Sequence, residues 1–213
     1  MIKRIITDLG GVIIHTDSSK FFKILREYHC GDSNDNFEFM FSVIPFHKLF
    51  SIGLISPLEF YDSTCRFLRV IIDYEDFVDA WNEILLKPNE KYCEFLKHVN
   101  KAGYAISLLS NIDKIHWKKV CEIEIIRDIF DCFDTFALSY LMGCAKPDPV
   151  IFEKTFALIS AVRPECVFID DKLENIQTAK SLGIPSILYN SEKHEEFLVE
   201  FKKLCPDFLM AEH

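Results

Sequence analysis

Residues 4–11 read RIITDLGG, a short apolar and β-branched run that ends at Asp8 and is followed by two glycines after one leucine. This pattern predicts a buried strand over residues 3–7 that leads into a tight loop, with an acidic side chain at the junction. The patterns in the rest of the chain indicate which strands pair with this one.

From residue 88 onward, helical patterns alternate with short apolar strands. Strands are expected at 104–109, 135–138, 166–169 and 186–189, and helices at 90–102, 114–121, 149–159, 174–182 and 193–204. Parallel neighbours need crossover connections, and these are right-handed. The sequence therefore predicts an α/β fold with a doubly wound, parallel, Rossmann-like sheet.

Between the first strand and this region, residues 16–87 show apolar residues at helical spacing. Ser56 and Pro57 suit the N-cap and N1 positions of one helix. Another helix is expected to begin near Asp73 and to carry Ile84 and Leu85 on its buried side. We therefore expect two domains, a core of residues 1–15 and 88–213 and an inserted all-helical cap of residues 16–87.

The composition argues against two classes of partner. The 213 residues include 24 Lys and Arg against 33 Asp and Glu, a net charge of −9 without a basic cluster, which argues against nucleic acid and anionic membranes. No apolar run approaches the ~18 residues of a membrane span. The eight cysteines contain no C-x-x-C pair, so we expect reduced thiols and a cytoplasmic protein. The oligomeric state stays open.

Polar residues gather where the expected strands end, which is where open α/β sheets bind ligands. Two carboxylates about 4 Å apart repel each other by about 4 kcal/mol at an effective dielectric of 20, so several acids at one site require a cation. Oxygen ligands favour Mg²⁺, and a nearby Lys with loop amides then suits a phosphate. The strand ends carry Asp8 with Gly10 and Gly11, Ser110 with Asn111, the segment 143–149 with Lys146, and Asp170 with Asp171.

At these positions the chain resembles the haloacid dehalogenase-like (HAD) hydrolases, and among them the phosphatases with a helical cap. Four motifs in order carry the resemblance over nearly the whole length: D-L-G-G-V from Asp8, L-S-N from Leu109, K-P-D-P from Lys146, and I-D-D from Ile169 with Asn175 beyond it. The L-S-N, K-P and paired-Asp motifs are those of the α-D-glucose-1-phosphatase-like group.

The resemblance implies a Mg²⁺-dependent phosphatase that hydrolyses a small-molecule phosphate monoester, such as a sugar phosphate with an anomeric phosphate, through an aspartyl-phosphate. Asp8 would be the nucleophile and Lys146 the catalytic cation. The implied metal ligands are Asp8, Gly10, Asp170 and Asp171, and the implied phosphate-binding residues are Gly10, Gly11, Ser110, Asn111 and Lys146.

Four more residues are candidates for substrate contact or for support of the site. His15 lies close to the nucleophile in sequence, and Asn175 lies one helical turn beyond the paired Asp motif. His47 and Lys48 belong to residues 46–53, which we expect to form a cap loop that faces the site.

Gly10 departs from the pattern of most HAD phosphatases, which carry an acid/base Asp there, and such a group is typically worth about 10² to 10⁴ in rate. In one reading the enzyme acts on esters with an acidic leaving group, or borrows His15, Asp17 or His47. In another it is catalytically impaired and binds phosphate or regulates. In a third it is a 2-haloacid dehalogenase. Because the chemistry of that class needs no Mg²⁺, no cation would offset the repulsion between Asp8 and the carboxylates of the paired Asp motif. The glucose-1-phosphatase-like group also lacks the second Asp, which favours activity.

Overall fold

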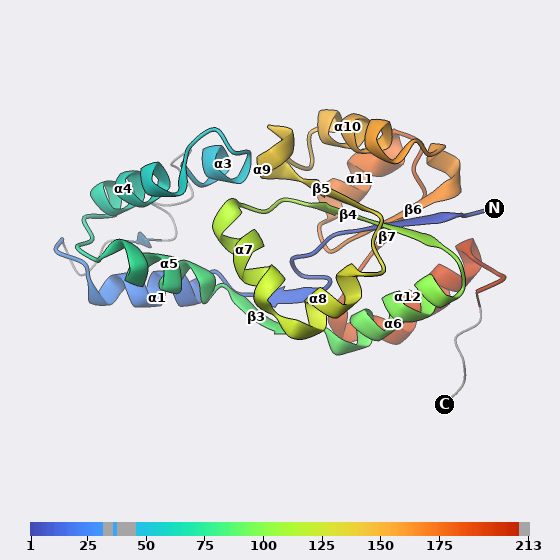
Figure 1. Cartoon of the computed structure of the whole chain (residues 1–213), viewed down its shortest axis with the longest axis horizontal. Helices are drawn as coiled ribbons and strands as arrows, with labels where there is room; N and C mark the ends of the chain where they lie inside the picture. The colour runs from blue at the N-terminus through green and yellow to red at the C-terminus, as the bar shows by residue number, and fades with distance from the viewer. Residues whose placement is uncertain (32–35, 38–45, 209–213) are drawn as a thin grey trace.

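The computed structural model describes residues 1–31, 36–37 and 46–208, and a five-stranded parallel sheet lies at its centre (Figure 1). The sheet order is β5-β4-β1-β6-β7, so the first strand is central and pairs with β4 on one side and β6 on the other. The predicted doubly wound α/β fold is confirmed. The strands are β1 (Arg4–Thr7), β4 (Ala105–Ser110), β5 (Thr135–Leu138), β6 (Cys166–Asp170) and β7 (Ser186–Leu188).

Helices cover both faces of this sheet (Figure 1). Successive side chains of a strand point to opposite faces, so Ile5 packs into the apolar core beneath α6 and α12, whereas Ile6 packs into the core beneath α10 and α11. Burial on both faces explains the continuous apolar run of the central strand. The helices of this part are α6 (Glu90–Lys101), α7 (Lys114–Glu122), α8 (Glu124–Phe130), α9 (Ser139–Met142), α10 (Pro149–Ile159), α11 (Leu173–Ser181) and α12 (His194–Leu204), with 3₁₀ turns η1 (Arg163–Glu165) and η2 (Ser191–Lys193).

Between β1 and α6, the described residues form four helices that lie together beyond one end of the sheet (Figure 1). They share a separate aromatic core in which the rings of Phe50 and Phe60 stack at 4.5 Å. Ser56 forms the expected helix start, because its hydroxyl accepts the N–H of Glu59 while the Glu59 carboxylate accepts the N–H of Ser56. These helices are α1 (Ser19–Glu27), α3 (Phe46–Ser51), α4 (Pro57–Leu68) and α5 (Tyr74–Asn82).

The ends of the inserted region differ from the all-helical expectation. The helix expected to carry Ile84 and Leu85 ends at Asn82, and β3 (Leu85–Pro88) instead pairs antiparallel with β2 (Ile14–Thr16). Asn89 holds this two-stranded ribbon to the chain after Asp8, because its backbone N–H donates to the carbonyl of Ile13 at 2.8 Å. The two ends of the insertion therefore lie side by side, and the division into a core and a cap domain stays a prediction.

The expected cap loop over residues 46–53 is wrong at its start, since residues 46–51 form α3. Phe50 explains the helix, because its buried ring packs into the aromatic core of the insertion. Only after Ser51 does the chain turn, through Gly53 at a φ of +73°.

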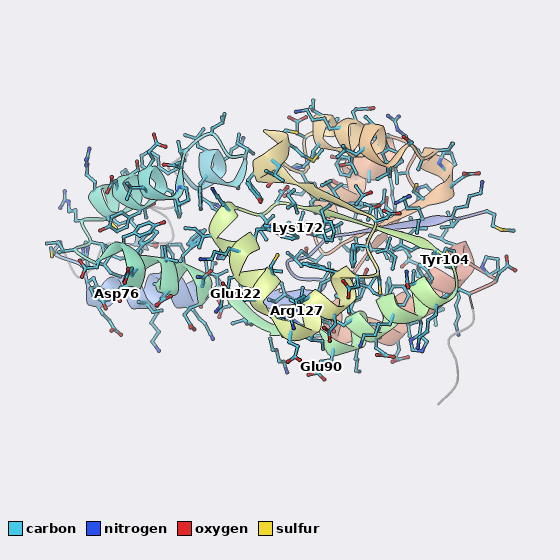
Figure 2. The ribbon with its side chains drawn as sticks, in the orientation of Figure 1. Asp76, Glu90, Tyr104, Glu122, Arg127 and Lys172 are labelled. Carbon is cyan, nitrogen blue, oxygen red and sulfur yellow. The ribbon has the colours of Figure 1, made fainter. Side chains whose placement is uncertain are left out.

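The outer surface of the helices is charged. Asp76, Glu90 and Glu122 are exposed on three different helices (Figure 2). None of the described helices is both long enough and apolar enough to cross a bilayer. All eight cysteines have free thiols.

Candidate active site

Three neighbouring strands deliver the candidate residues to one place. Asp8 follows β1, Ser110 closes β4 and Asp170 closes β6, and the carboxyl ends of these parallel strands lie next to one another. A cavity of about 600 Å³ opens there. Its lining comes from both sides, since Phe22, His47 and Trp81 of the insertion face Asp8, Gly10, Ser110, Asn111, Lys146, Asp171 and Asn175 of the sheet end.

Lys146 is the buried cation of the site. Its Nζ lies 2.9 Å from Asp8 Oδ1 and 2.7 Å from Asp170 Oδ2, and it donates to the Leu109 carbonyl at 2.7 Å. Burial alone would lower the pKa of Lys146, but attraction by the two carboxylates raises it above the ordinary value. The ammonium is therefore held ready beside Asp8, where a phosphoryl group would need positive charge.

Asn111 performs a task that sequence reasoning missed. Its side-chain Nδ2 donates to the Lys146 carbonyl at 2.7 Å, and its Oδ1 accepts the Lys146 N–H at 2.8 Å. The side chain is thus committed to positioning Lys146, and any contact of Asn111 with a phosphate would come from its backbone amide. The two residues are far apart in sequence, so no local pattern could reveal this contact.

The donor set fits a hard divalent cation. Asp8, Asp170 and Asp171 each offer an oxygen within 4.8 Å of the others. In the part of the chain that the structure describes, Asp171 Oδ1 is buried without a hydrogen-bond partner. Burial, with a contribution from Asp170, raises the pKa of Asp171 above its ordinary value. A bound Mg²⁺ would satisfy the orphan oxygen and offset the repulsion among the carboxylates.

Asp170 is the most constrained of the three carboxylates. Besides the Lys146 contact on Oδ2, its Oδ1 accepts the Lys172 N–H and the Asn175 Nδ2, both at 2.8 Å. Asn175, predicted from sequence as a supporting residue, therefore orients Asp170. Asp8 and Asp171 have fewer competing partners and are better placed to approach a cation directly.

The two glycines after the nucleophile differ in what they require. At Gly11, with a φ of +77°, an added Cβ would lie 2.1 Å from Asp171 Oδ2, so only glycine lets that carboxylate approach. At Gly10 an added Cβ would meet only Thr16 Cγ2 in the described part of the chain, at 3.6 Å, which is ordinary contact. The backbone therefore has room for a side chain where most family members carry Asp.

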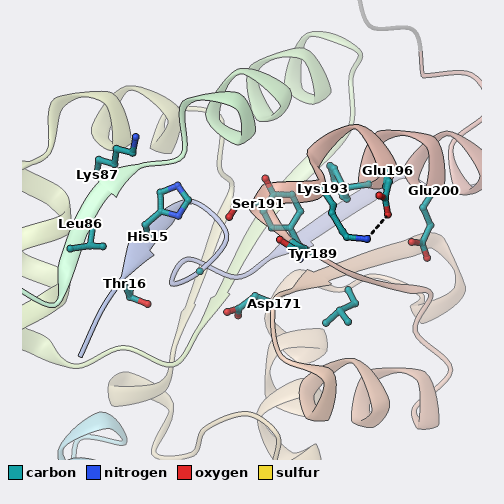
Figure 3. Close-up of a pocket in the computed structure, with 14 residues that line it drawn as sticks. His15, Thr16, Leu86, Lys87, Asp171, Tyr189, Ser191, Lys193, Glu196 and Glu200 are labelled. Carbon is teal, nitrogen blue, oxygen red and sulfur yellow. Dashed lines mark hydrogen bonds and ion pairs between the residues drawn. The ribbon is translucent and has the colours of Figure 1, made fainter. Parts of the chain in front are cut away.

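The remaining predicted residues lie in different places. His47 lines the cavity of Asp8, whereas Lys48 is exposed on α3 and lines neither of the two cavities near the paired Asp motif. His15 lines the second of these, a cavity of about 780 Å³ that also contains Asp171 and the Lys193–Glu196 ion pair (Figure 3). The histidine nearest to the nucleophile in sequence thus faces a different space.

A family comparison settles the membership of the chain. The model of the haloacid dehalogenase-like hydrolases matches residues 2–183. The chain belongs to this family. The D-ribitol-5-phosphate phosphatase of Bacteroides thetaiotaomicron is 26% identical to this HAD hydrolase over 186 residues, which cover 86% of the chain and 89% of that protein.

Solved structures agree with this membership. A HAD family enzyme from B. thetaiotaomicron, solved with magnesium and inorganic phosphate, is 30% identical to this HAD hydrolase with a TM-score of 0.77, and the match covers 91% and 96% of the two chains. A predicted HAD-like hydrolase from Porphyromonas gingivalis has a TM-score of 0.83 at 24% identity, covers 96% and 98%, and shows the fold alone. The predicted enzyme class, a HAD-like hydrolase with phosphatases among its relatives, is confirmed.

Proposed function

We propose that this HAD hydrolase is a Mg²⁺-dependent phosphatase that hydrolyses a small-molecule phosphate monoester through an aspartyl-phosphate on Asp8. The observation that carries the proposal is the 2.9 Å contact between Lys146 Nζ and Asp8 Oδ1 in a cavity at the carboxyl end of the sheet. A carboxylate and a fixed ammonium at one point suit attack on a phosphoryl group whose oxygens carry negative charge.

Two steps follow from this arrangement. An Asp8 carboxylate oxygen forms a bond to phosphorus while the bond from phosphorus to the ester oxygen breaks, and the leaving oxygen takes a proton from solvent water. Water then attacks the phosphorus, which releases phosphate and regenerates the Asp8 carboxylate. Lys146 holds phosphoryl charge and Ser110, buried at the end of β4, faces the same cavity.

The metal would be held by Asp8, the Gly10 carbonyl and Asp171, with Asp170 oriented beside them by Lys146 and Asn175. When bound, Mg²⁺ supplies positive charge to the phosphoryl oxygens. The chain's own residues do the rest, because Asn111 and Asp170 fix Lys146, and Gly11 lets Asp171 reach the site.

The cavity suits a small polyhydroxylated leaving group. Its lining combines hydroxyls and a charged group, Thr16, Ser18 and Lys172, with the apolar surfaces of Phe22 and Trp81. Lys172 lies near the middle of the molecule (Figure 2). We therefore propose a sugar or polyol phosphate, including anomeric phosphates, and the ribitol phosphate phosphatase among the relatives supports this class.

His47 is the group that replaces the absent acid/base Asp most directly. Of the three residues proposed from sequence to take this task, it lines the Asp8 cavity, whereas His15 and Asp17 do not. Desolvation by the protein around its ring lowers the pKa of His47 below its ordinary value. At neutral pH the imidazole is thus neutral, and it can accept a proton from the attacking water.

Phosphate release from p-nitrophenyl phosphate, acetyl phosphate, glucose 1-phosphate and ribitol 5-phosphate tests the proposal, with and without Mg²⁺. Asp8→Asn, purified identically, is the blank. We expect turnover that requires both Mg²⁺ and Asp8. Binding of Mg²⁺ and phosphate without turnover above the blank would instead favour the phosphate-binding or regulatory alternative that Gly10 suggests.

A further inference from the structure

A buried polar network joins the insertion to the sheet end beside the cavity. Trp81 lies on α5 of the insertion, and Asp113 and His116 lie at the start of α7, directly after the motif with Ser110 and Asn111. His116 Nδ1 lies 2.8 Å from Asp113 Oδ2, and His116 Nε2 lies 2.8 Å from the Trp81 carbonyl oxygen. Trp81 and His116 both line the Asp8 cavity.

The partners of the two ring nitrogens indicate the protonation state of His116. A carboxylate and a backbone carbonyl can only accept hydrogen bonds, so each contact requires an N–H on the imidazole. The two contacts together therefore fit the imidazolium form of His116, which carries a hydrogen on both ring nitrogens. Burial alone would lower the pKa of His116, but Asp113 and the two hydrogen bonds raise it above its ordinary value. Burial likewise opposes ionisation of Asp113, yet His116 brings the pKa of Asp113 below its ordinary value.

Each polar group of the three side chains has a partner in this network. The Trp81 indole N–H donates to Asp113 Oδ2 at 3.1 Å, and Asp113 Oδ1 accepts the N–H groups of Ile115 and His116 as the N-cap of α7. The rings of Trp81 and His116 stack with centroids 4.8 Å apart and planes at 17°. On the indole, the His47 ring packs edge-on at 5.5 Å.

We infer that His116 is a positioning residue whose imidazolium fastens α5 to α7 and so holds the inserted helices, with His47, over the Asp8 cavity. The inference rests on the proposed function for its consequence in catalysis, but its geometry does not depend on it. Among the described residues, the titratable groups that face the pair are His47 on α3 and Tyr140 on α9, and Lys172 faces His47 from the start of α11.

A second contact between the insertion and the core predicts a graded effect. Ser139 Oγ donates to the Ser51 carbonyl, and an added Cβ at Gly53 would lie 2.1 Å from the Tyr140 carbonyl oxygen. Loss of the His116 imidazolium is therefore expected to loosen α5 while the contact at α3 and α9 persists.

Nitrogen NMR of the wild-type protein tests the charge state without any assay of activity. We expect both ring nitrogens of His116 to show N–H protons at pH 7.5, whereas an ordinary histidine has lost one of them by then. The His116→Gln variant assigns the signals. A His116 that titrates near pH 6.5, or has only one N–H at pH 7.5, would overturn the inference.

Hydrogen exchange tests the fastening itself. In His116→Gln, amides of residues 74–82 are expected to exchange about tenfold faster, the effect of losing a charged hydrogen bond, while those of β4 and β6 keep their rates. The Asp113→Asn/His116→Gln double variant avoids an unpaired buried carboxylate and retains an N-cap, so it separates loosening from loss of folding. His98→Gln on α6 is the matched control. Unchanged exchange over residues 74–82 in both variants would overturn the inference.

Kinetics then connect the fastening to catalysis. In the double variant we expect KM for a sugar phosphate to rise about tenfold, while KM for acetyl phosphate, whose leaving group is too small to need the inserted helices, stays within about twofold. If the wild-type protein shows no turnover, the proposed function fails, and the NMR and exchange results alone decide the role of His116. An equal rise in both KM values would overturn the positioning role.

Discussion

Lys146 Nζ and Asp170 Oδ2 lie 2.7 Å apart, and neither side chain is accessible to solvent. The same ammonium also contacts Asp8, so one cation compensates two buried carboxylates. Such an arrangement makes the cation a requirement of folding as well as of chemistry, because a buried charge without its partner is costly.

Lys146→Met is therefore expected to lower the free energy of unfolding by about 3–5 kcal/mol and to abolish turnover. Urea denaturation at pH 7 measures the first effect. Lys193→Met is the matched control, since its ion pair with Glu196 is exposed and should contribute less than about 1 kcal/mol. Equal losses in the two variants would contradict the compensation argument.

Gly11→Ala should weaken Mg²⁺ binding about tenfold or more, the scale of disturbing a residue that supports a metal ligand, because the new methyl group would collide with Asp171. Gly183→Ala is a close control, with the same φ of +77° and no atom of the described residues within 4 Å of an added Cβ. Both variants bear the strain of a positive φ. Calorimetric titration measures the affinity for Mg²⁺, which we expect to stay at the wild-type value in Gly183→Ala. Similar affinities in the two variants would refute the proposed approach of Asp171.

Gly10→Asp should speed hydrolysis of alkyl phosphates, whose leaving groups need a proton, by at least about 10²-fold, the lower end of the range of about 10² to 10⁴ that acid/base catalysis provides. Acetyl phosphate should gain little. Gly10→Asn matches the size but cannot transfer a proton at neutral pH, so a similar gain in that variant would point to packing instead. The ratio of kcat/KM between the two substrates measures the effect.

Removal of Mg²⁺ should lower thermal stability. At a free concentration of about 100 times Kd the ion is expected to add about 2.7 kcal/mol to the free energy of unfolding, and EDTA should reverse this. Asp171→Asn should lose most of the increment, because Asp171 Oδ1 is a buried carboxylate oxygen without a hydrogen-bond partner among the described residues. An unchanged increment in that variant would place the ion elsewhere.

The Asp113–His116 pair gives the stability a defined pH dependence. The pKa of His116 is raised from 6.5, so its contribution is complete below pH 6.5 and is lost as the pH rises through the folded value. The pKa of Asp113 is lowered from 3.8, so its contribution is complete above pH 3.8 and is lost as the pH falls through the folded value. The stability difference between wild type and the Asp113→Asn/His116→Gln variant should thus be largest near pH 5 and shrink on both sides. Urea midpoints at several pH values measure it, and a difference that grows above pH 7 would contradict the assignment.

Residues that follow strands could be predicted from the sequence, because a strand end is a local feature and parallel strands end at one edge. Asp8, Ser110 and Asp170 were placed in this way, and they line or adjoin the cavity. Contacts made across the chain could not be predicted. The commitment of the Asn111 side chain to Lys146, and the bridge from His116 to Trp81, depend on how helices pack, which no spacing in the sequence expresses.

The β2–β3 ribbon was missed for a related reason. Leu85 continues the apolar spacing of the preceding helix, so periodicity alone favours a longer helix. The pairing with residues 14–16 decides the outcome, and pairing partners distant in sequence leave no local signal. Residues 46–51 show the opposite difference. A loop was expected there, and a helix forms that buries Phe50.

The ribbon also makes the enzyme modular. Because the inserted helices leave and rejoin the sheet-bearing part at adjacent strands, their length and content can change without shifting the register of any strand in the central sheet. If the inserted helices select the alcohol, as the proposed function implies, evolution can exchange them and leave the residues at the end of the sheet unchanged. Swapping residues 17–84 for the corresponding helices of a relative is accordingly a rational route to new substrates on this scaffold.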